Sequence, residues 1–153
     1  MTTADQHGAG RRGMTWPQML ALAIGVVYTL VGIVGFFITG FDDFAEHTDE
    51  TILGFGINPL HNIVHLVIGL AGIALSRKLG TARTYGWLLA VGYGAAFVYG
   101  LFAAGETDSL NFLSINWADN WLHLASVLAG LAIALGPVKD ATTRGRDESL
   151  RTR

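Results

Sequence analysis

The chain has 153 residues, of which 51% are hydrophobic and 14% are charged, and its mean hydropathy is +0.42. Soluble domains carry about a quarter charged residues, so this chain has too few charges to cover a soluble globule. It contains no cysteine, which excludes disulfides, thiolate nucleophiles, zinc–cysteine sites and iron–sulfur clusters.

Four segments are apolar enough to be membrane-spanning helices, which need roughly 20 predominantly apolar residues. These predicted spans are residues 17–41, 59–76, 85–104 and 117–136. Asn58 and Asn116 stand at the N-cap positions of the second and fourth spans, and Pro59 occupies the favoured first helical position. Pro137 ends the fourth span. The predicted fold class is therefore all-α, a four-helix transmembrane bundle.

The basic residues predict the orientation of the chain in the membrane. All ten precede the first span, join the second to the third, or follow the fourth: Arg11, Arg12, Arg77, Lys78, Arg83, Lys139, Arg144, Arg146, Arg151 and Arg153. Because cytoplasmic loops carry the excess of lysine and arginine, both termini and the middle loop are predicted to be cytoplasmic. We divide the chain into a polar cytoplasmic tail (1–16), a four-span membrane domain (17–138) and a highly charged, disordered cytoplasmic tail (139–153).

The other two loops carry acidic residues instead. These are Asp42, Asp43, Glu46, Asp49, Glu50, Glu106, Asp108 and, at the end of the second of these loops, Asp119. One interpretation is a solvated rim that avoids positive charge during insertion. The other is a mouth that attracts cations.

The second and fourth spans repeat one pattern at a shift of 58 residues. The shift aligns Asn58 with Asn116, Asn62 with Asn120 and His65 with His123. The first and third spans repeat more faintly at a shift of 65, where Tyr28 aligns with Tyr93 and Gly35 with Gly100. The chain is therefore predicted to consist of two tandem, pseudo-symmetric helical hairpins, related by an axis along the membrane normal.

This repeat predicts where the ionisable residues of the spans lie. His61 and His65 are four residues apart and share a helix face, as do Asp119 and His123. His65 and His123 each lie six residues inside their helix, roughly 9 Å below the outer boundary. If both faces point inward, the four side chains form one polar cluster, and Asn62 lies beside it. Ionisable residues inside a membrane usually face the bundle interior and mark a functional site.

Two interpretations of the cluster use hydrogen bonds or metal ligation. In the first, asparagine and histidine side chains only bond across helices and stabilise the bundle by about 0.6 kcal/mol per contact. That structural polar cluster comprises Asn62, His65, Asn120 and His123. In the second, three imidazoles and a carboxylate bind zinc, copper or iron. That metal site comprises His61, His65, Asp119 and His123. Asp119 has a competing role, because acidic residues favour the first turn of a helix, where they cap it.

Two further interpretations concern haem and protons. A haem b could be held between His65 and His123, although the site is shallow. An outward-lying histidine near acidic groups could instead sense protons near physiological pH. The sequence carries no phosphate-binding glycine loop, deaminase signature or zinc-protease signature. Tyr28, Tyr93 and Tyr99 are expected to be core aromatics with local hydrogen-bond partners.

The stretches "GFGINPLHNIVHLVIGLAG" and "SINWADNWLHLASVLAG" resemble small actinobacterial membrane proteins, the domain-of-unknown-function family 4383. The likeness covers about residues 19–136. Its hallmarks are LHNxVHLxxG, which falls on residues 60–69, and ADNWLHL, which falls on residues 118–124. The family has no established activity, so the resemblance implies a four-helix protein of a bacterial plasma membrane and supplies no catalytic residues.

We therefore expect a multi-pass membrane protein that is not an enzyme but an accessory or sensing component, with its polar cluster near the outer face. The alternative is a metal- or haem-binding redox protein. The lipid bilayer is the expected partner, with another membrane protein or a second copy of the chain as further candidates, and no nucleic acid.

Overall fold

The computed structural model describes residues 13–138, so the predictions for most of the N-terminal tail and for residues 139–153 lie outside the described residues. Four α-helices dominate this part of the chain: α1 (Trp16–Thr39), α2 (Pro59–Leu75), α3 (Leu79–Ala103) and α4 (Trp117–Leu135). The remaining elements are a two-stranded hairpin, β1 (Thr51–Ile52) and β2 (Phe55–Gly56), and a short 3-10 helix, η1 (Ser109–Asn111). The predicted all-α class is confirmed.

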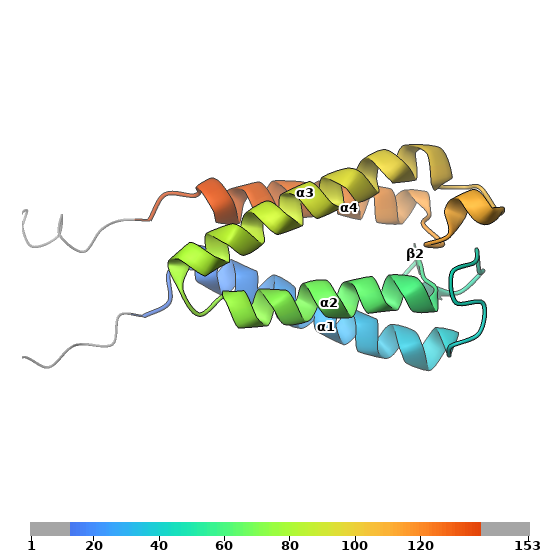
Figure 1. The fold of residues 1–153 in the computed structure, drawn as a ribbon, viewed down its shortest axis with the longest axis horizontal. Coiled ribbons are helices and arrows are strands. Elements are labelled where there is room, and N and C mark those ends of the chain that lie inside the picture. The colour runs from blue at the N-terminus through green and yellow to red at the C-terminus, as the bar shows by residue number, and fades with distance from the viewer. Residues whose placement is uncertain (1–12, 139–153) are drawn as a thin grey trace, which may run out of the picture.

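The helices are arranged as two antiparallel pairs, with α1 packed on α2 and α3 packed on α4 (Figure 1). Contacts between the pairs are much sparser. A turn at residues 76–78 joins α2 to α3, at the same end of the bundle where α1 begins and α4 ends (Figure 1). We call this the turn end and the opposite end the capped end.

Small residues bring the helices of each pair close together. A Cβ atom at Gly25 would lie 2.6 Å from the backbone nitrogen of Ile73, and one at Gly130 would lie 2.7 Å from that of Ala90. Close backbone approach of this kind is the usual role of small residues between membrane helices. Gly92 of α3 does not have this role. No atom lies within 4 Å of a Cβ built at Gly92, because α4 packs on a different face of α3.

Three of the described helices are long and apolar enough to cross a membrane: α1, α3 and α4. The fourth, α2, is apolar but has 17 residues, which is the lower limit for a span. Helix α3 begins at Leu79, six residues before the predicted start of the third span. The polar residues 79–84 are too hydrophilic to count as span, yet they continue the helix toward the turn.

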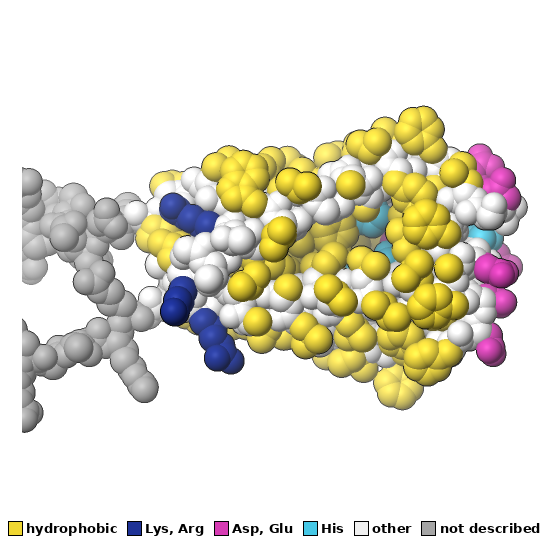
Figure 2. Space-filling view, viewed as in Figure 1, with side chains coloured by type: hydrophobic (Ala, Val, Ile, Leu, Met, Phe, Trp, Pro, Cys, Tyr) yellow, Lys and Arg dark blue, Asp and Glu magenta, His cyan; other side chains and the backbone are white. Residues whose placement is uncertain are grey.

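The surface of the bundle is apolar along the helices and charged at its ends (Figure 2). Large apolar side chains are exposed on every helix, for example Val27, Val67, Val91 and Leu128. Arg77, Lys78 and Arg83 lie at the turn end, and acidic residues gather at the capped end (Figure 2). This pattern points to a membrane location for the helices.

Residues 40–58 and 104–116 form a loop cap over one end of the bundle. The two loops are bonded to each other: the Ser114 hydroxyl donates to the Thr48 carbonyl at 3.0 Å, and the Thr48 amide donates to the Ser114 hydroxyl oxygen at 3.1 Å. The Asn111 side chain stabilises its own loop, because it donates to the Ile115 carbonyl and accepts from the Ile115 amide. The cap therefore fixes the starts of α2 and α4 relative to each other.

Candidate functional site

Asparagine caps set the starts of the two helices that carry the histidines. The Asn58 side-chain oxygen accepts from the His61 amide at 2.8 Å, and the Asn116 oxygen accepts from the Asp119 amide at 3.0 Å. Pro59 is the first residue of α2, as predicted. Both caps stabilise the first helical turn by bonding an otherwise unpaired amide.

The first histidines of the site come from one face of α2. His61 and His65 are four residues apart, and their ring centroids lie 4.4 Å from each other. His123 of α4 faces them from the other helix pair, and its ring centroid is 6.3 Å from that of His61. The structure therefore brings together the three histidines that the repeat pattern selected. We call His61, His65 and His123, with the two tyrosines described next, the His/Tyr cluster.

Two tyrosines complete this cluster from the first helix of each pair. Tyr28 of α1 packs on His65 with ring centroids 5.1 Å apart, and Tyr93 of α3 packs on His123 at 5.3 Å. The two tyrosines stack on each other at 5.4 Å. The sequence predicts only that both tyrosines are core aromatics. Their alignment at a shift of 65 residues was the available signal that they belong to the site.

The hydroxyl groups of these tyrosines differ. The Tyr28 hydroxyl lies 2.7 Å from the Ser126 hydroxyl, and Ser126 in turn donates to the Leu122 carbonyl at 2.8 Å. The Tyr93 hydroxyl is buried without a hydrogen-bond partner among residues 13–138. The expectation of local partners was therefore wrong for both residues, since Tyr28 bonds to another helix pair and Tyr93 bonds to nothing in the described chain. Tyr99 bonds to the Leu110 carbonyl in the adjoining loop.

The imidazoles are buried and incompletely bonded. His61, His65 and His123 are 2%, 5% and 3% exposed. The Nδ1 atom of each is buried without a hydrogen-bond partner among residues 13–138. A buried polar atom left unpaired costs about 1–3 kcal/mol, so three of them in one cluster call for an explanation.

Asp119 is buried near the cluster but is bonded to the loop cap. Its Oδ2 atom accepts from the Gly56 amide at 2.8 Å and from the Asn116 amide at 3.1 Å. It therefore caps α4 and holds the β1–β2 hairpin. Across residues 13–138, no group of three or more histidine, aspartate or glutamate side chains is arranged to hold a metal ion. The metal and haem interpretations thus gain no support from the geometry.

The asparagines Asn62 and Asn120 are buried but face their own helix pair. The Asn62 side chain lies against Gly35 and donates to the Thr39 hydroxyl at 3.0 Å, and Asn120 lies against Gly100. In the described chain neither bonds to a histidine. The expected asparagine–histidine bonds across helices are therefore absent there, because the two residue types project toward different neighbours.

Asp119, His123 and Ser126 share one face of α4, an order that invites comparison with a hydrolase triad. A triad requires the nucleophile bonded to the histidine and the histidine bonded to the acid. Here Asp119 bonds to cap amides and Ser126 bonds to Tyr28 and Leu122. The three side chains therefore lack the connections that nucleophilic catalysis needs.

A family described as a domain of unknown function (DUF4383) matches residues 18–136, which is most of the chain. No curated protein and no solved structure matches.

Proposed function

The chain belongs to the DUF4383 family of unknown function, and from this premise we propose that it is a multi-pass, non-enzymatic membrane component whose His/Tyr cluster senses protons at the outer face. The proposal includes a bacterial plasma membrane, cytoplasmic termini and an origin by duplication of one helical hairpin. The capped end is then the outer end.

The observation that carries the proposal is the set of three unpaired imidazoles inside an apolar bundle. Histidine is the side chain whose unperturbed titration falls between pH 5 and 8. Ionisable residues inside membranes are costly and are kept where they serve a function. Hydrogen-bonded glue would leave the Nδ1 atoms paired, and here all three are unpaired in the described chain.

Protonation of the cluster would be a coupled event. The His61 ring centroid lies 4.4 Å from that of His65 and 6.3 Å from that of His123. Two unit charges 4 Å apart repel by about 4 kcal/mol at the effective dielectric constant typical of proteins. A first proton would therefore oppose a second.

Two kinds of group near the rings would offset part of the cost of placing one positive charge in the cluster. Tyr28 and Tyr93 offer aromatic faces within about 6 Å of the adjoining imidazoles, the range of cation–π attraction. Asp119 supplies the carboxylate on the same helix as His123.

The loop cap is the part of the protein that we expect to move when the cluster is protonated. His61 lies in the first turn of α2, directly after the Asn58 cap, and Asn58 also donates to the carbonyls of Glu46 and Phe112 at 2.8 Å. Any separation of His61 from His123 would therefore shift the two loops relative to each other. A partner protein that binds the loop surface would respond to this movement.

Histidine ring NMR on the full chain in lipid nanodiscs tests the proposal. As the pH is lowered below neutral, His61, His65 and His123 should titrate as a coupled group. His123→Gln should shift the titration of the other two, whereas the control His47→Gln, in the loop cap, should not. Independent titration of the three rings, or no titration before unfolding, would reject the sensor.

Metal analysis and a visible spectrum of the same sample distinguish proton sensing from the alternative, a metal- or haem-binding function. Stoichiometric metal or a Soret band that is lost in His65→Ala and His123→Ala would replace proton sensing with a metal or haem function. A colourless, metal-free protein whose rings titrate together is the expected result.

A further inference from the structure

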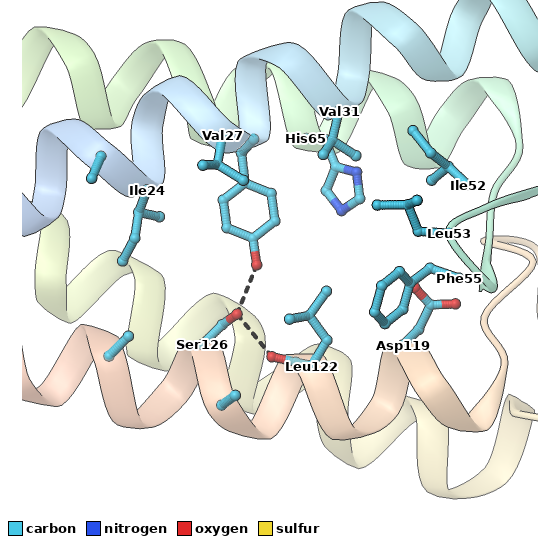
Figure 3. A pocket seen from close by; sticks show the side chains of 14 residues that line it. Ile24, Val27, Val31, Ile52, Leu53, Phe55, His65, Asp119, Leu122 and Ser126 are labelled. Carbon is cyan, nitrogen blue, oxygen red and sulfur yellow. Dashed lines mark hydrogen bonds between the residues drawn. The ribbon is translucent and has the colours of Figure 1, made fainter.

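A groove of about 470 Å³ runs between α1 and α4, along the seam between the two helix pairs (Figure 3). Its walls include Ala23 and Val27 of α1 and Ala125 and Ala129 of α4. The groove exists because α1 and α4 make far fewer contacts with each other than with their own partners, and because alanines leave space there. Its volume is within the range of small-molecule sites.

The polar groups of the groove that lack a partner in the described chain lie toward the capped end, whereas the Tyr28 and Ser126 hydroxyls farther along it are bonded to each other. His65 projects between α1 and α4 (Figure 3), and its Nδ1 atom is buried and unpaired in the described chain. Asp119 lines the same end, and its Oδ1 atom makes no hydrogen bond to residues 13–138. A ligand in the groove would therefore meet one hydrogen-bonding end and one long apolar stretch.

The mouth of the groove opens on the apolar surface of the bundle. Val27 lines the groove and is 57% exposed, and Leu30 and Leu128 are exposed on the same two helices. A ligand would enter from lipid, since these helices present apolar side chains on their surface.

The β1–β2 hairpin covers the capped end of the groove. The Asn116 side chain donates to the Gly54 carbonyl at 2.9 Å, which fastens the hairpin turn to α4. Leu53 lines the groove from this turn with a φ of 54°, a backbone conformation that leucine rarely adopts. Asparagine or glycine is favoured in such turns, and the Leu53 side chain is 92% exposed at the mouth of the groove.

We propose that this groove binds a single-chain lipid alcohol, with its hydrocarbon chain between α1 and α4 and its hydroxyl bonded to His65 and Asp119. The depth of the polar end argues for a small head group. His65 lies six residues inside α2, roughly 9 Å from the helix start, which is below the level of a phospholipid head group. The hydroxyl oxygen would accept from an N–H of the His65 imidazole, and the hydroxyl would donate its proton to the free carboxylate oxygen of Asp119.

Photolabelling of the full chain in phosphatidylcholine vesicles tests this site. The probe is hexadecanol carrying a diazirine near the middle of its chain, with mapping of the labelled peptides by mass spectrometry. Labelling should fall on α1 and α4 and be displaced by unlabelled hexadecanol. Label spread evenly over all four helices would overturn the proposal.

Two exposed positions provide a matched pair of variants. Ala125→Phe fills the groove, whereas Val67→Phe changes the equivalent exposed position of the other helix pair, which does not line it. Ala125→Phe should abolish site-specific labelling, and Val67→Phe should leave it intact. Equal labelling of both variants would place the probe elsewhere and reject the groove as the site.

The head group is tested by changing the probe. A diazirine-bearing alkane without the hydroxyl should label the site about tenfold less, the expected loss for unpaired polar groups. His65→Phe should abolish the preference for the alcohol. Equal labelling by alkane and alcohol, or stronger labelling by a lysophosphatidylcholine probe, would overturn the assignment to a lipid alcohol. None of these readouts depends on titration, so this inference and the proton-sensing proposal fail separately.

Discussion

Two equivalent contacts show how single residues shape the bundle. The Asn62 side chain occupies the space that a Cβ atom at Gly35 would need, and Asn120 does the same at Gly100. Both pairs come from positions that align in the sequence repeat. The repeat identified these residues, but it does not predict that the asparagines contact glycines and not histidines. That outcome depends on the rotation of each helix about its own axis.

Alanine at Gly35 or Gly100 should destabilise the protein. The new methyl group would overlap a buried asparagine side chain, and overpacking of this kind costs about 1–3 kcal/mol. Thermal unfolding in detergent measures the change. Gly92→Ala is the control, because a Cβ there meets nothing within 4 Å and alanine is favoured over glycine in a helix by about 0.5–1 kcal/mol. A neutral Gly35→Ala would show that the packing is looser than described.

The two cluster tyrosines should respond differently to loss of the hydroxyl. Tyr28→Phe removes the bond to Ser126 and should cost about 0.5–1.5 kcal/mol. Tyr93→Phe removes a buried hydroxyl that has no partner in the described part of the chain, so stability should stay equal or rise. Unfolding of both variants under one set of conditions makes the comparison. A larger loss for Tyr93→Phe would mean that its hydroxyl has a partner in the membrane-embedded protein.

At the scale of elements, the helices were more predictable than the connections. Asn58, Pro59 and Asn116 marked helix starts correctly, since capping depends on the chemistry of a few adjacent residues. The β1–β2 hairpin was not predicted, because its turn is Leu53–Gly54 and lacks the asparagine or aspartate that usually signals it. The loop cap was equally hidden, since its bonds join residues far apart in the chain.

Substitutions at Asn58 should separate its role as the N-cap of α2 from its role in holding the two loops of the loop cap together. Asn58→Asp keeps the oxygen that accepts from the His61 amide but loses the donor to Glu46 and Phe112. Hydrogen exchange should therefore rise in residues 40–58 while α2 stays protected. Asn58→Ala should loosen both, with a cost of about 0.5–2 kcal/mol for the lost cap. Identical exchange patterns in the two variants would contradict this division of roles.

At the scale of the whole molecule, composition predicted the apolar helices, and the repeat predicted which histidines meet. The groove between α1 and α4 could not be predicted, because it depends on how the two helix pairs pack against each other. Asp119 illustrates the same limit. Its spacing from His123 suggested a metal ligand, but its Oδ2 atom accepts a hydrogen bond from the Gly56 amide of the β1–β2 hairpin instead.

The absence of cysteine makes the predicted orientation directly testable. Single substitutions Asp49→Cys in the loop cap and Lys78→Cys in the α2–α3 turn place one thiol at each end, both at exposed positions. In intact cells, a membrane-impermeant maleimide should label Asp49→Cys and leave Lys78→Cys unlabelled until the cells are opened. The reverse pattern would invert the topology and place the cap in the cytoplasm.

The α2–α3 turn has a consequence for how the molecule is assembled. Only residues 76–78 join the two helix pairs covalently, whereas Trp16 bonds to the Pro137 carbonyl at one end and Asp119 bonds to Gly56 at the other. The two helix pairs therefore associate like the subunits of a dimer, with a short covalent connection between them. A gene divided at this turn should therefore yield two polypeptides that find each other in the bilayer and restore the complete bundle.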